Sequence, residues 1–146
     1  MVVASVSTET TRFDLKTVVG GWVELRELSH GQMLRRREMS TEQAMKFSGK
    51  GKVDDAEMAI KMAQRAASEF EFRHCIVAHN LEEQVPPKKG EKDPTTRPFD
   101  FSDPSSLDRL SPKVGEEIDQ LISNMNNFDD GVADGSGNLP TESTNQ

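Results

Sequence analysis

Apolar side chains recur at every fourth position through Met58, Met62, Ala66 and Phe70. This spacing is typical of an amphipathic helix, and charged residues fill the opposite face in pairs one turn apart. From residue 70 onward apolar and polar side chains alternate as in a strand, although the helical stripe also continues through the same stretch. The pattern therefore predicts a helix to about Arg73 and leaves residues 70–80 open between strand and helix.

Two shorter alternating runs come earlier, RFDLK at 12–16 and WVELREL at 22–28. Between them lies the pair Gly20-Gly21, and adjacent glycines favour a turn. The pattern predicts a β-hairpin. Because an isolated hairpin is only marginally stable, its apolar face is expected to pack on a helix.

A helix is also predicted over 29–47. Ser29 and Gln32 have the spacing of a capping box, and a weak apolar stripe follows them. The segment SGKGK at 48–52 interrupts the helical pattern before the central helix begins, with Asp54 as its start signal.

The second half predicts a short helical turn at 104–110 and a longer helix at 112–127. Each begins with an N-cap residue followed by proline, Asp103-Pro104 and Ser111-Pro112. The longer helix has the cleanest apolar stripe of the chain, made of Val114, Ile118, Leu121, Ile122 and Met125.

These elements predict an α+β fold that is mainly α-helical, with an N-terminal β-hairpin packed on about three helices. Phe99 and Phe101, which follow a run rich in proline and charge, are expected to dock on the core. The expected divisions are a flexible N-terminus at 1–11, a hairpin and helical core at 12–83, a Pro-rich linker at 84–106, a C-terminal helix packing on the core at 107–128, and a disordered acidic tail at 129–146.

The charge distribution along the chain limits the kinds of molecule that the protein is expected to bind. The chain has 146 residues and a net charge of −7, and only 34% of it is hydrophobic. Residues 1–90 carry 14 basic and 13 acidic side chains, whereas residues 91–146 carry 4 basic and 12 acidic ones. An acidic second half repels nucleic acid and anionic membranes, so neither is expected as a partner.

Cellular location is predicted from what the sequence lacks. There is one cysteine, which excludes an internal disulfide and suits a reducing cytoplasm. The first residues show neither a basic leader nor a long apolar run, so no signal peptide is expected. Nothing reaches the roughly 20 apolar residues of a membrane span.

No catalytic constellation is recognisable, and no catalytic residue, cofactor or metal is predicted. Cys75 and His79 would share a face of a helix, but a structural zinc site needs four ligands and no second cysteine exists. SGKGK lacks the preceding strand and the closing Ser or Thr of a phosphate-binding loop. The run Arg35 to Arg37 is expected to form a solvated helix face.

The methionines suggest a binding surface instead. Two successive predicted helices carry Met33, Met39, Met45, Met58 and Met62. Methionine is adaptable and is used on surfaces that bind several partners, but it also fills ordinary cores, which is the more frequent case. These five residues are the candidate partner-binding set.

Three segments resemble tail assembly chaperones of long-tailed bacteriophages. They are FDLKTVVGGWVELRELS at 13–29, CIVAHNLEE at 75–83, and LDRLSPKVGEEIDQLISNMN at 107–126. Their order and spacing are similar to the family pattern over roughly residues 12–128. His79 stands where that pattern usually has tryptophan.

The resemblance implies a small, mainly helical, non-catalytic chaperone. Such proteins bind the tape measure protein, keep it soluble, and help to recruit the major tail protein during virion assembly. The expected location is the host cytoplasm, outside the mature virion, and self-association is left open. The alternative is a structural virion protein, for tail completion or head–tail joining. A second alternative is a small enzyme or regulator that uses Cys75, His74 and His79.

Overall fold

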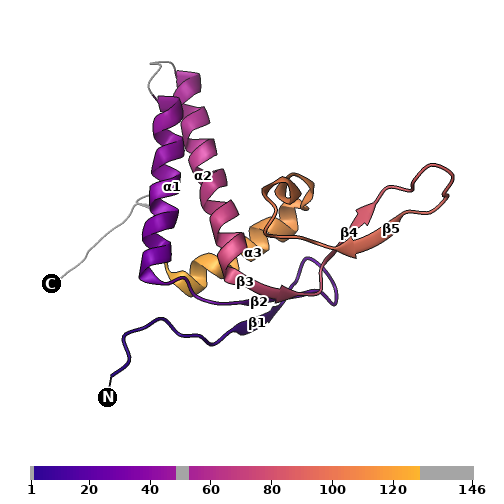
Figure 1. The fold of residues 1–146 in the computed structure, drawn as a ribbon, viewed down its shortest axis with the longest axis horizontal. Coiled ribbons are helices and arrows are strands. Elements are labelled where there is room, and N and C mark those ends of the chain that lie inside the picture. The colour runs from indigo at the N-terminus through magenta and orange to yellow at the C-terminus, as the bar shows by residue number, and fades with distance from the viewer. Residues whose placement is uncertain (1, 49–52, 129–146) are drawn as a thin grey trace.

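A computed structural model describes residues 2–48 and 53–128 of the chain. Residues 49–52 of the helix break predicted at 48–52, and the predicted disordered tail at 129–146, lie outside the described residues, whereas Ser48 is the last residue of a helix. The prediction of an α+β fold that is mainly helical is confirmed (Figure 1). In chain order the elements are β1 (Thr11–Asp14), β2 (Trp22–Leu25), α1 (His30–Ser48), α2 (Val53–Cys75), β3 (Ile76–His79), β4 (Glu82–Val85), β5 (Thr95–Pro98), the 3-10 helix η1 (Pro104–Arg109) and α3 (Pro112–Asn126).

The N-terminal hairpin is confirmed and is extended by a third strand. β1 pairs antiparallel with β2, and β2 pairs antiparallel with β3. The registers place Val23 opposite Phe13 on one side and opposite His79 on the other. The choice that the sequence left open over 70–80 is thereby settled, because α2 ends at Cys75 and the chain continues directly as β3.

The turn of this hairpin is tied to the end of β3. Asn80 accepts a hydrogen bond from the Trp22 N–H and donates one to the Gly20 carbonyl, both at 2.8 Å. Gly20 has a φ of +81°, which glycine adopts without steric cost. A Cβ on Gly21 would lie 3.0 Å from side-chain atoms of Leu81 and Val18. Each position of the predicted turn therefore favours glycine, Gly20 because of its positive φ and Gly21 because a side chain there would crowd its neighbours.

Helices α1 and α2 run side by side as a two-helix arm that projects away from the sheet (Figure 1). The predicted capping box starts α1, since the Gln32 N–H donates to Ser29 Oγ at 3.1 Å and the Ser29 N–H donates to Gln32 Oε1 at 2.9 Å. Along the arm, the Ser40 hydroxyl donates to the Ala63 carbonyl at 3.0 Å and joins the two helices.

The apolar core lies where the foot of the arm, the three-stranded sheet and α3 meet. Val23, Leu25, Cys75, Ile118 and Ile122 are fully buried there. The stripe predicted for the C-terminal helix is confirmed, because Val114, Ile118 and Ile122 are buried while Leu121 and Met125 pack against the same cluster.

Polar contacts hold α3 at both of its ends. The Glu117 carboxylate accepts hydrogen bonds from the backbone N–H groups of Lys16 and Thr17 at 2.7 and 3.0 Å. At the other end, Asn126 Oδ1 accepts one from the Leu28 N–H at 2.8 Å. Through these hydrogen bonds, α3 holds in place both the β1–β2 loop and the segment that leads from β2 into α1.

Part of the segment predicted as a linker at 84–106 is ordered structure. β4 and β5 form a second antiparallel hairpin that projects on the side away from the arm (Figure 1). The prolines and the glycine that predict a linker lie mostly in the loop between these strands, where they do not interrupt pairing. The strands carry too few apolar residues to show alternation, so pattern analysis misses them.

Docking of the two phenylalanines after β5 is confirmed, since Phe99 and Phe101 are buried. Phe101 packs edge-on against His79, with ring centroids 4.8 Å apart, and against Phe72 at 5.8 Å. These contacts hold the base of the second hairpin on the core.

The two predicted helix caps differ. Asp103 Oδ1 accepts a hydrogen bond from the Ser105 N–H at 3.0 Å and caps η1 as expected. Ser111 occupies the N-cap position of α3, but its side chain makes no capping bond. Its carbonyl instead accepts the first helical bond from the Gly115 N–H at 2.9 Å.

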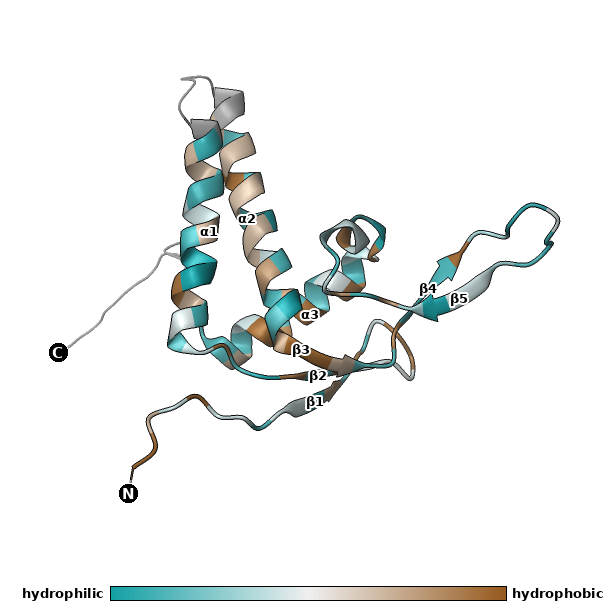
Figure 2. Cartoon of the chain, viewed as in Figure 1, coloured by the Kyte–Doolittle hydropathy of each residue, from teal (hydrophilic) through white to brown (hydrophobic). Residues whose placement is uncertain are grey.

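Apolar residues are not confined to the core. Figure 2 shows brown and beige segments on β3 and α3, and again along α2 well away from the sheet. No helix among the described residues is long and apolar enough to cross a membrane.

Candidate functional site

The thiol and imidazoles that the sequence singles out do not face one another. Cys75 is fully buried at the end of α2, and burial raises the pKa of its thiol to about 12. His79 uses Nδ1 to accept a hydrogen bond from the Leu81 N–H at 3.0 Å and packs on Phe101. A thiol with so high a pKa is a weak nucleophile at neutral pH.

Potential metal ligands do not cluster either. Within residues 2–48 and 53–128 there is no group of three His, Cys, Asp or Glu side chains arranged to hold a metal ion.

The five candidate methionines fall into three environments on the arm. Met33 and Met39 pack against the core from α1. Met39 and Met62 line the same hollow between the helices, and Met58 lies one turn from Met62 with 46% of its surface exposed. Met45 is 71% exposed and lies on the outer stripe of α1 that also carries Leu34. The structure thus brings Met39 and Met62 together and separates Met45 from them.

Ile60, which the sequence analysis did not select, adds to the exposed apolar surface of the arm. It lies on α2 with 59% of its surface exposed. Ile60 does not lie on the face of α2 that carries the apolar stripe, so helical periodicity predicts a polar residue at its position. An apolar residue where the periodicity predicts a polar one was the signal in the sequence that could have identified it.

A groove runs along the seam between α1 and α2. Its lower part is a hollow of about 650 Å³ near the foot of the arm, and its upper part is a smaller one of about 190 Å³. Arg35, Met39 and Glu69 line both hollows, so the two are adjacent along the seam. We call this feature the arm groove.

Ion pairs border the arm groove. Arg35 Nη1 lies 2.6 Å from Glu38 and 3.8 Å from Glu42, and Arg65 contacts Glu69 at 2.9 Å and Asp108 at 3.0 Å. Most of these side chains are at least two-fifths exposed, and such pairs contribute only about 0–1 kcal/mol each. The charged side chains that border the groove can therefore exchange these partners for others at a small cost in free energy.

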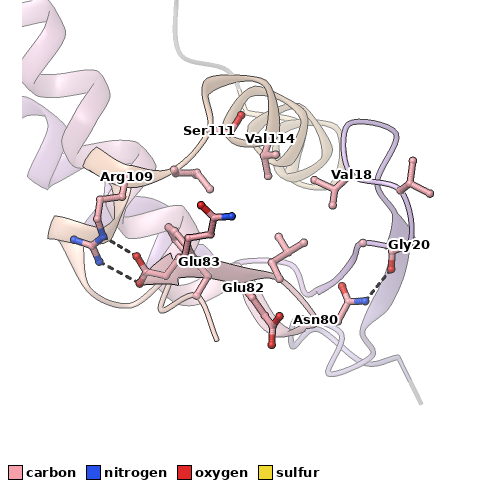
Figure 3. Close-up of a pocket in the computed structure, with 14 residues that line it drawn as sticks. Val18, Gly20, Asn80, Glu82, Glu83, Arg109, Ser111 and Val114 are labelled. Atoms are coloured by element: carbon pink, nitrogen blue, oxygen red, sulfur yellow. Dashed lines mark hydrogen bonds and ion pairs between the residues drawn. The ribbon is translucent and has the colours of Figure 1, made fainter. Parts of the chain in front are cut away.

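A separate hollow, of about 620 Å³, lies between the β1–β2 turn, β4 and the start of α3 (Figure 3). Its lining includes Val18 and Val114. At one end Arg109 forms a two-point ion pair with Glu83, and this contact lowers the pKa of Glu83. At the other end Asn80 bonds Gly20. Two of the charged groups at this hollow, Arg109 and Glu83, are therefore paired with each other.

Arg36 is an exception to the predicted solvated face of Arg35 to Arg37. Arg35 and Arg37 are exposed, but Arg36 is buried and its Nε lies 2.6 Å from Glu71 on α2. Three consecutive residues on a helix point in three directions, and the middle one of this run faces α2.

A third charged side chain, Asp119 on α3, lies close to this pair. Burial raises the pKa of its carboxyl to about 6, although Arg36 and a hydrogen bond with Ser68 act in the opposite sense. One of its oxygens, Oδ1, is buried without a hydrogen-bond partner. Asp119 therefore opposes folding when it is ionised.

We expect Asp119→Asn to stabilise the protein above about pH 6. Because the pKa is higher in the folded protein than in the unfolded chain, protonation favours folding, and this contribution is present below about pH 4 and lost as the pH rises through 6. The gain at pH 7.5 is roughly 1–3 kcal/mol, and it should vanish below about pH 4. Urea unfolding at both pH values measures it. Asp14→Asn, at an exposed carboxylate, is the control, and an equal gain there would contradict the assignment.

Comparison of the chain with known protein families, curated proteins and solved structures yields no match.

Proposed function

We propose that this protein is a non-catalytic tail assembly chaperone of a long-tailed bacteriophage. In this role it binds the tape measure protein, keeps it soluble, and helps to recruit the major tail protein in the host cytoplasm. The observation that supports the proposal is the two-helix arm, which projects from the core and exposes Met45, Met58 and Ile60 (Figures 1 and 2).

A chaperone of this kind must satisfy two physical demands. A long amphipathic helix has an apolar stripe that aggregates unless another apolar surface covers it, and adaptable side chains such as methionine can cover stripes of varied shape. The complex must also repel its neighbours, and a net charge of −7 contributes to that. An arm that rises from a well-packed core can supply apolar surface without loosening the core.

Co-expression with the tape measure protein tests the proposal. We expect that protein to move from the insoluble to the soluble fraction and to co-purify with this chain. A variant with Met45, Met58 and Ile60 all changed to lysine should keep its circular dichroism, because all three are exposed, but lose the effect. Val19→Lys is the matched control, since Val19 is a fully exposed apolar residue on the β1–β2 turn.

Two results would contradict the proposal. A tape measure protein that is equally insoluble with and without this chain would exclude the chaperone function. Stoichiometric amounts of this chain in purified virions would favour the alternative, a structural virion protein.

A further inference from the structure

We propose that the arm groove is the site where a helix of the partner protein binds. The helix that it selects is amphipathic and has acidic residues at the end that lies over the foot of the arm. The inference rests on the proposed function, because it names where and how the helical partner binds. The exposed Met45, Met58 and Ile60 lie outside the groove and contact the parts of a long client helix that extend beyond it.

The floor of the arm groove is apolar and regular. Met62, Ala66 and Phe70 recur once per turn on α2, and Met39 lines the groove from α1. Ala66 and Phe70 are less than one-tenth exposed, so they form a fixed base. Residues 62–73 of α2 extend over roughly 18 Å at about 1.5 Å per residue, enough for about three turns of a bound helix.

The composition of this floor suits a helix rather than a single side chain. Ala66 is small and lies between Met62 and Phe70, which leaves a recess into which a larger side chain of a bound helix can fit. Met39 and Met62 are flexible and can adjust to side chains of different shape. A third helix along the seam would thus complete a three-helix arrangement that α1 and α2 leave open.

The charges at the foot of the groove are mainly positive. Arg35 on α1 and Arg73 on α2 line the lower hollow together with Glu69, which pairs with Arg65. His74 also lines it, and its pKa is lowered, first by burial and then by Arg73 and Arg26, so the imidazole is mostly neutral at pH 7. A helix that brings carboxylates to this end meets two arginines.

The charges that line the upper hollow balance. Arg35 and Glu42 line it from α1, and Arg65 and Glu69 line it from α2, where Arg65 is held by Glu69 and Asp108. The groove therefore has a cationic foot and a neutral wall above it. Since the chain as a whole carries a charge of −7, this local cationic foot gives direction to the docking of an acidic helix.

Arg35 can take part in such binding without unfolding the arm. Its side chain is 53% exposed, and its bonds to Glu38 and Glu42 are surface contacts. Exchange of one exposed carboxylate for another costs little. Arg73 is also exposed, and Nη2 donates to the Ser102 carbonyl at 3.2 Å, which leaves its other donors available.

Peptide binding tests the inference directly. The probe is a fluorescein-labelled 18-residue amphipathic helix with a leucine stripe and two glutamates at one end, and its counterparts carry two lysines there or a scrambled stripe. Fluorescence anisotropy should show binding of the glutamate peptide, weaker binding of the lysine peptide, and none of the scrambled one. Met62→Lys should weaken binding about tenfold or more, because it places a charge on the apolar floor.

Two further variants keep the test decisive if Met62→Lys disturbs folding. Arg35→Glu changes an exposed residue, so the fold should persist while the preference shifts from the glutamate peptide to the lysine peptide. Met45→Lys, on the outer stripe, should bind as the wild type does. Equal binding by wild type, Met62→Lys and Arg35→Glu would overturn the inference, and so would a wild-type dimer that Met62→Lys converts to a monomer, because a second copy would then occupy the groove.

The co-expression assay separates failure of the inference from failure of the proposed function. If the wild type keeps the tape measure protein soluble and Met62→Lys and Arg35→Glu do so equally well, the groove assignment is wrong while the chaperone function stands. If the wild type has no effect but the peptides bind as described, the groove is a helix-binding site with a different partner, and the chaperone function is wrong.

Discussion

Replacing Ile118 by aspartate is expected to unfold the protein. Ile118 lies in the middle of α3, is fully buried, and belongs to the core cluster that also contains Val23 and Leu25 of the sheet. A carboxylate placed there would be charged and without a partner, which costs several kcal/mol. Because small domains have only roughly 5–15 kcal/mol of stability in all, the folded population should collapse.

Circular dichroism and a urea titration measure this effect. Gln120→Asp is the matched control, because it introduces the same side chain at an exposed position of the same helix and should cost little. If Ile118→Asp stays folded and instead loses partner binding, the stripe on α3 would be an interface and its assignment to the core would be wrong.

The elements predicted well from sequence are those whose pattern and packing agree. On α3 the spacing of Val114, Ile118 and Ile122 is the spacing of the side chains that enter the core. The first hairpin is likewise predictable because Gly20 and Gly21 mark its turn and apolar side chains alternate in both strands.

The second hairpin cannot be recognised from the sequence pattern, because it is stabilised by interactions other than the packing of an alternating apolar face. β4 and β5 are held by backbone pairing, by the Glu83 carboxylate between Arg97 and Arg109, and by Phe99 and Phe101 after the strand. None of these leaves an alternating pattern in the strands themselves. The boundary between α2 and β3 is hidden for a related reason, since apolar residues around 70–80 satisfy both periods, and only pairing with β2 selects the strand.

The five candidate methionines lie on the two helices of the arm, but their positions relative to one another could not be predicted from the sequence. The period of a helix tells which residues share a face, whereas the rotation of α1 against α2 decides which faces border a common groove. Met39 and Met62 meet at the groove, while Met33 turns towards the core and Met45 turns outward. Glu69, which lines the same groove, comes from the charged side of its predicted helix.

Truncation of either member of the Arg36–Glu71 pair should strongly destabilise the protein. The two side chains are 11% and 5% exposed, and Arg36 also lies over the ring of Phe128 at 4.0 Å. Arg36→Met leaves the Glu71 carboxylate buried beside α1 and also removes the cation near Asp119, whereas Glu71→Leu leaves the guanidinium buried near Asp119 without its closest carboxylate. Loss of one member of a buried pair typically costs about 3–5 kcal/mol, mostly because the other charge stays buried.

A double-mutant cycle separates the pair from the packing around it. The double variant Arg36→Met, Glu71→Leu should cost less than the sum of the two single changes, because it removes the guanidinium and the Glu71 carboxylate together. Arg35→Met is the control on the same helix: Arg35 is 53% exposed, its bond to Glu38 is a surface contact, and its loss should cost no more than about 1 kcal/mol. If Arg36→Met costs no more than Arg35→Met in urea unfolding, Arg36 is hydrated in solution and does not anchor α1 to α2.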